Sequence, residues 1–130
     1  MSSSGSLIVG VPVVSVHGDY YVSPHFGRAP FIAFVEVTGD KYRVLEVVEN
    51  PYARHERRRG AVLIEFMASR GVKSVIVLGV GYGAYYGLRE RGIKVYYVPL
   101  SKAGQVPLTA AIEMFINKQL EEATEPRELE

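Results

Sequence analysis

The 130-residue sequence contains no cysteine and no tryptophan. The absence of cysteine excludes disulfides, zinc–thiolate sites, iron–sulfur clusters held by the chain's own thiolates, and cysteine nucleophiles. The sequence also lacks a strong charge of either sign, because 15 Lys and Arg residues stand against 14 Asp and Glu residues. Nucleic-acid-binding domains usually carry a marked basic excess, so we expect no nucleic-acid partner.

Long hydrophobic runs are missing as well. Residues 1–6 are mostly serine with no basic residue, and the apolar stretch from Leu7 to Val16 is interrupted by Pro12. A secretory signal begins with basic residues, and a membrane-spanning helix needs about 20 apolar residues. We therefore expect a cytoplasmic protein that does not associate with membranes, with a disordered N-terminus over residues 1–6.

What the sequence does contain is the pattern of one α/β domain over residues 7–120. Runs of apolar, mostly β-branched residues predict strands over 7–11, 31–37, 42–48, 74–78 and 93–98. Apolar residues at helical spacing, with glycine or proline at the ends, predict helices over 60–70, 84–91 and 108–120. The remaining residues, 121–130, are acidic and contain a proline, and we expect a flexible tail there.

The order of these elements predicts a five-stranded mixed sheet with three helices. The second and third strands have the spacing of a β-hairpin, and helical crossovers make the last three strands parallel. If the first strand is antiparallel to the second, four strands end at one edge, where open α/β sheets bind ligands. We expect the loops 12–30, 50–59 and 79–83 to line one cleft at this edge.

The most distinctive segment of the first loop runs from Ser23 to Arg28, with the sequence SPHFGR. A neutral imidazole at His25 could ligate a metal, and the guanidinium of Arg28 could balance an anion. Gly27 allows a close approach of the backbone to a ligand. The alternative is a structural loop in which His25 bonds to the backbone and Phe26 fills the core.

Two further segments are candidate anion sites. Residues 54–59 contain four arginines and His55 just before a predicted helix, whose N-terminus favours anions; a solvated loop is the alternative. Gly79, Gly81 and Gly83 form a turn between a strand and a helix that matches the G-x-G-x-x-A dinucleotide fingerprint. No acidic residue ends the next strand to hold a ribose, so we interpret this turn as an anion cradle or a tightly packed turn.

The sequence offers little for catalysis. A nuclease needs several metal-binding carboxylates at strand ends, and a serine hydrolase needs a nucleophile elbow; neither pattern is recognisable. His17, beside Gly18, is typical of a surface turn. We therefore expect no enzymatic activity.

The nonapeptide SPHFGRAPF at residues 23–31 resembles the signature of the dinitrogenase iron–molybdenum cofactor biosynthesis family. That family includes the nitrogenase accessory proteins NifX and NafY and the C-terminal domain of NifB. The resemblance continues through residues 49–51, 77–81 and 92–96 and covers roughly residues 7–120. It implies a ribonuclease H-like fold without nuclease activity.

The resemblance also implies a function in cofactor carriage. The chain would bind an iron–sulfur or iron–molybdenum cluster, or a precursor, and deliver it from a donor protein to a recipient that need not be nitrogenase. The resemblance makes His25 the metal ligand, and preassembled clusters bring their own sulfides and a negative charge. We predict a cluster site formed by His25, Phe26, Gly27, Arg28, His55, Gly79, Gly81 and Gly83. Two alternatives stay open: a phosphate- or nucleotide-processing enzyme that uses the glycine turn and the arginines, and a protein–protein adaptor without a small ligand.

Overall fold

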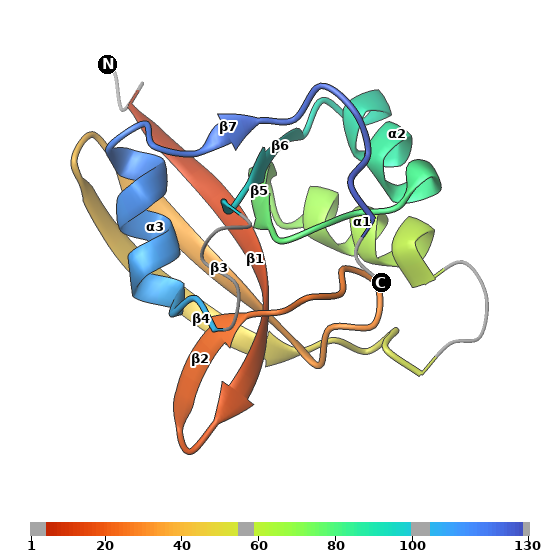
Figure 1. The fold of residues 1–130 in the computed structure, drawn as a ribbon, viewed down its shortest axis with the longest axis horizontal. Coiled ribbons are helices and arrows are strands. Elements are labelled where there is room, and N and C mark those ends of the chain that lie inside the picture. The colour runs from red at the N-terminus through yellow and green to blue at the C-terminus, as the bar shows by residue number, and fades with distance from the viewer. Residues whose placement is uncertain (1–4, 55–58, 100–104, 129–130) are drawn as a thin grey trace.

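A computed structural model describes residues 5–54, 59–99 and 105–128. Within these residues the chain forms a single α/β domain with one mixed seven-stranded sheet and three helices (Figure 1). The strands are β1 (Ser6–Val16), β2 (Asp19–Val22), β3 (Phe31–Thr38), β4 (Lys41–Glu49), β5 (Val72–Val77), β6 (Lys94–Tyr97) and β7 (Glu121–Glu122). The helices are α1 (Arg59–Ser69), α2 (Tyr82–Glu90) and α3 (Leu108–Ile116). None of these helices, the only ones in the described residues, is long and apolar enough to cross a bilayer.

The α/β class, the mixed sheet and the three helices are confirmed, but the predicted number of five strands is wrong. All five predicted strands are present as β1, β3, β4, β5 and β6, and β2 and β7 are additional. Of the N-terminal segment predicted to be disordered, residues 1–4 lie outside the described residues, and Ser6 begins β1.

The strand order is β4-β3-β1-β5-β6-β7, with β2 paired to β1. β1 is antiparallel to β3 and parallel to β5, β3 and β4 form the expected hairpin, and β5 is parallel to β6. β1, β4, β5 and β6 therefore run in the same direction, as predicted. The segments that follow them lead to the same edge of the sheet.

The first additional strand replaces most of the loop predicted over residues 12–30. β1 continues to Val16, and the chain then reverses through His17 and Gly18, whose φ angles are 53° and 86°. Positive φ at both central residues is the geometry of tight two-residue hairpins, and β2 pairs back onto β1. The prediction of His17 as a turn residue is confirmed, and the loop is confined to residues 23–30.

The second additional strand lies in the segment that we predicted to be a flexible tail. β7 pairs antiparallel with β6, and the Ala123 N–H donates to the carbonyl of Val95 at 2.8 Å. The hydroxyl of Tyr97 donates to the carbonyl of Glu125 at 2.7 Å. In the segment predicted to be a flexible tail, hydrogen bonds thus join residues 121–127 to the sheet and to the residues that follow its strands.

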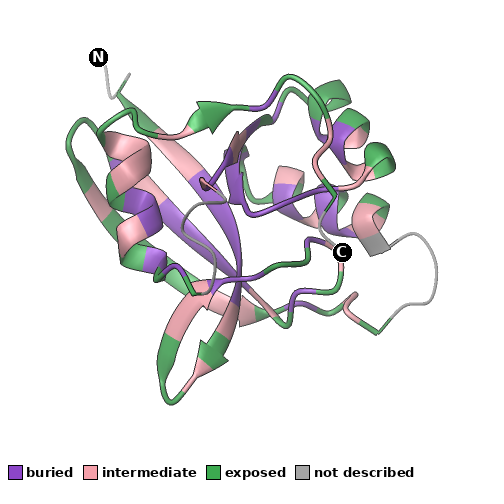
Figure 2. Ribbon diagram, viewed as in Figure 1, coloured by how far each residue is buried: buried purple, intermediate pink, exposed green. Residues whose placement is uncertain are grey.

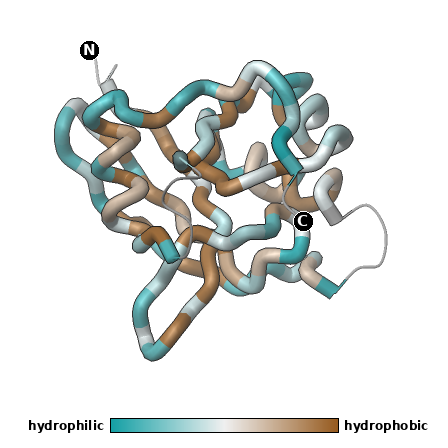
Figure 3. Tube along the Cα trace, viewed as in Figure 1, coloured by the Kyte–Doolittle hydropathy of each residue, from teal (hydrophilic) through white to brown (hydrophobic). Residues whose placement is uncertain are grey.

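Two hydrophobic cores lie on opposite faces of the sheet. α1 and α2 cover one face, where Leu63, Met67 and Leu88 are fully buried. α3 covers the other face and places Ile112 against the valines of β1 and β3. Figure 2 shows the buried residues concentrated along the inner strands, and Figure 3 shows that the same segments are the most hydrophobic.

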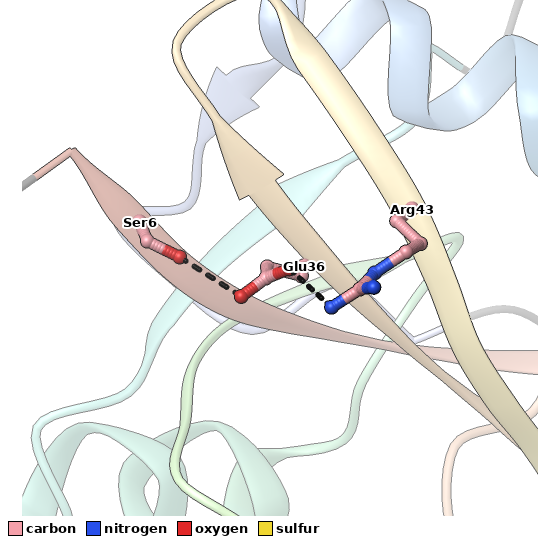
Figure 4. A network of polar contacts seen from close by, with 3 residues as sticks. All are labelled: Ser6, Glu36 and Arg43. Atoms are coloured by element: carbon pink, nitrogen blue, oxygen red, sulfur yellow. Dashed lines mark hydrogen bonds and ion pairs between the residues drawn. The ribbon is translucent and has the colours of Figure 1, made fainter. Parts of the chain in front are cut away.

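A polar network joins β1, β3 and β4 near the start of β1 (Figure 4). The hydroxyl of Ser6 donates to one carboxylate oxygen of Glu36 at 3.3 Å, and the guanidinium of Arg43 donates to the other at 3.0 Å. These contacts are exposed, so each contributes at most about 1 kcal/mol. Glu36 is paired with Ile8 of β1 and with Arg43 of β4, so the network follows the register of the three strands.

Candidate functional site

The loop that carries the predicted metal ligand is fixed by the buried side chain of Asn50. Its amide nitrogen donates to the carbonyls of Gly27 at 3.0 Å and Ala29 at 2.9 Å. Its amide oxygen accepts the N–H of Tyr52 at 2.9 Å. Only an amide offers two donors and an acceptor in this arrangement, so Asn50 sets the path of the loop. We did not predict this role, and the only signal for it was that residues 49–51 belong to the family resemblance.

The residues on either side of His25 anchor it to the domain. The hydroxyl of Ser23, a buried residue, accepts the N–H of His25 at 3.1 Å. Phe26 is 5% exposed and belongs to the core beneath α1 and α2. Phe26 thus fills the core, as the structural alternative predicted, while the His25 residue itself stays exposed.

The imidazole of His25 contacts the guanidinium of Arg28, with 3.2 Å between Nδ1 and Nη2. A guanidinium has no acceptor, so Arg28 donates and Nδ1 accepts through its lone pair. The neutral ring in this contact carries its proton on Nε2. Partial burial, and then the positive charge of Arg28, hold the pKa of His25 below its ordinary value of 6.5. The imidazole is therefore neutral at pH 7, with its lone pair directed at Arg28.

These residues border a cavity of about 550 Å³ between the His25 loop and the helices α1 and α2. The lining comprises His25, Phe26, Gly27 and Arg28 from the loop, Gly60, Ala61 and Ile64 from α1, Gly81, Gly83, Ala84 and Gly87 from the α2 side, and Glu128 from the C-terminal segment. We call this cavity the α1–α2 cleft.

Small residues allow the two helices to approach closely beside the cleft. A Cβ atom at Gly87 would lie 3.0 Å from Cδ1 of Ile64, and one at Gly60 would lie 3.5 Å from Cβ of Ala84. A Cβ at Gly83 would meet nothing within 4 Å. Gly87 therefore lets Ile64 pack closely against α2, whereas Gly83 leaves open space beside the helix.

The N-terminal end of α2 lies at the cleft. Gly81 is its N-cap and provides no side chain to cap the helix, and the first turn contains no acidic residue. The first N–H groups of a helix have no partner within the helix, and they carry a partial positive charge. Together with Arg28, they make this side of the cleft favourable for a negative group.

The structure brings together six of the eight predicted site residues. His25, Phe26, Gly27 and Arg28 meet Gly81 and Gly83 at the same cleft, as expected for loops at one sheet edge. Gly79 is buried after β5 and is not among the lining residues. His55, with the arginine-rich residues 55–58, lies outside the described residues.

The described residues contain no group of three or more His, Cys, Asp or Glu side chains that could hold a metal ion. Among the described residues, the His25 loop brings one imidazole to the cleft, with one guanidinium beside it. Such a set suits a metal group that brings most of its own ligands. Glu128, which we predicted to belong to a flexible tail, is the one acidic residue among the described residues that line the cleft.

The comparison with known families decides the assignment. The family model described as dinitrogenase iron-molybdenum cofactor matches residues 8–118, most of the chain. The chain belongs to this family. The uncharacterized protein MJ0580 of Methanocaldococcus jannaschii is 30% identical to this chain over 100 residues, which is 77% of this chain and 80% of that protein.

Superposition on solved structures shows which known proteins share the fold of this chain. The apo form of the orange protein from Desulfovibrio gigas superposes with a TM-score of 0.76 at 24% identity, covering 93% of this chain and 96% of that one. A Thermotoga protein provisionally named NifB superposes with a TM-score of 0.70 at 30% identity, covering 95% of this chain and 99% of that one. The family resemblance seen in the sequence is thereby confirmed, and the α/β fold is shared over nearly the whole chain.

Proposed function

We propose that this protein binds an anionic iron–sulfur or iron–molybdenum cluster, or a precursor of one, in the α1–α2 cleft and carries it to an apo-protein. The observation that carries the proposal is the meeting of His25 and Arg28 with the glycine-rich N-terminal end of α2 at one cavity. Membership of the dinitrogenase iron-molybdenum cofactor family supports a role in cofactor biosynthesis. The cluster is cargo in this proposal, and neither the chemistry of its assembly nor catalysis by this chain is required.

The contact between His25 and Arg28 suggests how the cargo is received. The lone pair of Nδ1 is directed at the guanidinium, so it can coordinate a metal only after Arg28 turns away. An anionic cluster provides the reason for this turn, because its sulfides accept charge-assisted hydrogen bonds from the guanidinium. Arg28 thus protects the ligand atom in the empty protein and contacts the cargo in the loaded one.

The rest of the cleft suits a bulky group that is held loosely. The open space at Gly83 lets a ligand approach the backbone at the start of α2. The cavity of about 550 Å³ lies within the usual range for small-molecule sites. One imidazole and several hydrogen bonds form a reversible attachment, which is what transfer to a recipient requires.

The test is anaerobic loading with a synthetic iron–sulfur cubane capped by small thiolates, followed by desalting and measurement of bound iron. We compare the wild-type protein with His25→Asn and with the matched control His17→Asn, which changes the exposed histidine of the β1–β2 turn. Asparagine tolerates the positive φ of position 17 and is a poor ligand for iron at position 25. We expect the wild type and His17→Asn to retain iron and His25→Asn to lose most of it, at both low and high salt.

Equal iron retention by His25→Asn and the wild type would leave His25 as a structural loop residue. Thermal stabilisation by a nucleotide, with no iron uptake, would instead favour a nucleotide-processing protein. An Arg28→Gln variant refines the result, because the attraction between a guanidinium and an anion is screened by salt. We expect Arg28→Gln to weaken cluster binding mainly at low ionic strength.

A further inference from the structure

The segment after β7 runs beside the turn that joins β5 to α2 (Figure 1). Val80 and Arg127 exchange two backbone hydrogen bonds, of 2.9 and 3.1 Å. The guanidinium of Arg127 donates to the carbonyl of Leu78 at 2.7 and 3.1 Å and to that of Val98 at 2.6 Å. It also lies over the ring of Tyr97, 4.2 Å from the centroid. Arg127 is thus an anchor that fixes the C-terminal segment to the ends of β5 and β6.

Glu128 follows this anchor directly and lies at the cleft. Its Oε2 is 3.0 Å from the point that a Cβ atom at Gly81 would occupy, so the absence of a side chain at Gly81 makes room for the carboxylate. Gly81 is the N-cap of α2, and Glu128 lines the same cavity as His25 and Arg28. The chain therefore places one of its own carboxylates beside Gly81, at the start of α2.

We infer that Glu128 is an internal competitor of the anionic cargo: its carboxylate occupies the start of α2 in the empty cleft and leaves when the cargo binds. This inference rests on the proposed function, and it concerns the regulation of the same site. Two negative groups in one cleft repel each other, and the partial positive charge at the start of α2 can stabilise only one of them at close range.

Because Arg127 is anchored, the exchange between carboxylate and cargo requires only the side chain of Glu128 to move. The backbone hydrogen bonds and the guanidinium hold residue 127 in place, whereas Glu128 is an exposed residue whose side chain can turn towards solvent. Loading therefore requires no unfolding of the C-terminal segment. When the cargo leaves for a recipient, the carboxylate returns to the start of α2 and opposes rebinding, which favours release.

The experiment is an anaerobic titration of the full chain with the thiolate-capped iron–sulfur cubane. It compares the wild type, Glu128→Gln and the matched control Glu125→Gln. Both variants remove one negative charge from the same segment, but Glu125 is not among the residues that line the cleft, and its backbone carbonyl accepts a hydrogen bond from Tyr97. We expect Glu128→Gln to lower the dissociation constant by about three- to tenfold at low salt, and less at high salt. Glu125→Gln should change it by less than about twofold.

Equal dissociation constants for Glu128→Gln and the wild type would overturn the inference. A weaker affinity of Glu128→Gln would overturn it as well, because the carboxylate would then be contributing to cargo binding. The His25→Asn variant separates these failures from failure of the proposed function. If the wild type binds and His25→Asn does not, while Glu128→Gln matches the wild type, only the inference about Glu128 is wrong. If neither the wild type nor Glu128→Gln binds the cubane, the proposed function and the inference both fail.

Discussion

The two faces of the sheet are covered in different ways. On one face the single helix α3 lies on the valines of the central strands, and its buried side chains are aliphatic. On the other face α1 and α2 lie against each other, and glycine and alanine occupy the positions where they approach the cleft. The contrast teaches that missing side chains shape this face: glycines between two helices leave a cavity of about 550 Å³ beside a tightly packed core.

The largest effect that we expect comes from the α3 face. Ile112 is fully buried there, and its replacement by Ala leaves a cavity, so Ile112→Ala should lower the free energy of unfolding by about 2–5 kcal/mol. Urea denaturation measures this loss. The NMR signals of the His25 ring should stay unchanged, because the two cores lie on opposite faces. A large shift of those signals would show that the faces are not independent.

The next effect concerns the loop on the cleft face. Asn50→Ala removes three hydrogen bonds and leaves the carbonyls of Gly27 and Ala29 without a donor. We expect the free energy of unfolding to fall by about 2–4 kcal/mol. In contrast to Ile112→Ala, this variant should also shift the NMR signals of His25. Unchanged signals together with normal stability would contradict the role of Asn50 in fixing the loop.

Two glycines of α2 test the origin of the cleft. Gly87→Ala places a methyl group 3.0 Å from Cδ1 of Ile64, and this crowding should outweigh the helix preference of alanine and lower the free energy of unfolding by about 1 kcal/mol. Gly83→Ala meets no atom within 4 Å, and it should raise that free energy by about 0.4–1 kcal/mol because alanine leaves the unfolded chain fewer conformations than glycine. The added methyl group at position 83 borders the cleft and should weaken cubane binding. Equal stabilities of the two variants would contradict this account of helix packing.

The same contrast shows which parts of the fold could be predicted. The inner strands are continuous apolar runs, and they were all found because burial on both faces requires that pattern. β2 was missed because Pro12 suggests a break in the strand. Pro12 is tolerated since it lies between the last β1–β5 pair, at Gly10, and the first β1–β2 pair, at Val13. That position depends on which strands become neighbours, and the local sequence does not contain it.

The candidate site likewise has a part that could be predicted from the sequence and a part that could not. The loop of His25 and the glycine turn were predicted to meet because both follow strands that end at one edge, and they do. Glu128 could not be predicted, because its place depends on hydrogen bonds from Arg127 to carbonyls of Leu78 and Val98, which are distant in sequence. The one available signal was Arg127 itself, a single basic residue in an acidic segment.

The smallest effect is electrostatic and lies within the cleft. Burial and the charge of Arg28 hold the pKa of His25 below 6.5 in the wild type. Arg28→Gln removes the charge, so the pKa of His25 should rise, and protonation should displace a bound metal at a higher pH than in the wild type. An NMR titration of the imidazole between about pH 5 and 8 measures this change. An unchanged or lower pKa would mean that Arg28 does not contact the ring in solution.

The central claim, that the imidazole of His25 is a ligand of the cargo, is tested most directly by pulsed EPR of the loaded and reduced protein. The histidines carry nitrogen-15, and the cubane serves as cargo. We predict a hyperfine coupling from a histidine nitrogen in the wild type and in His17→Asn, and no such coupling in His25→Asn. A loaded wild-type protein without nitrogen coupling, or a coupling that persists in His25→Asn, would contradict the claim.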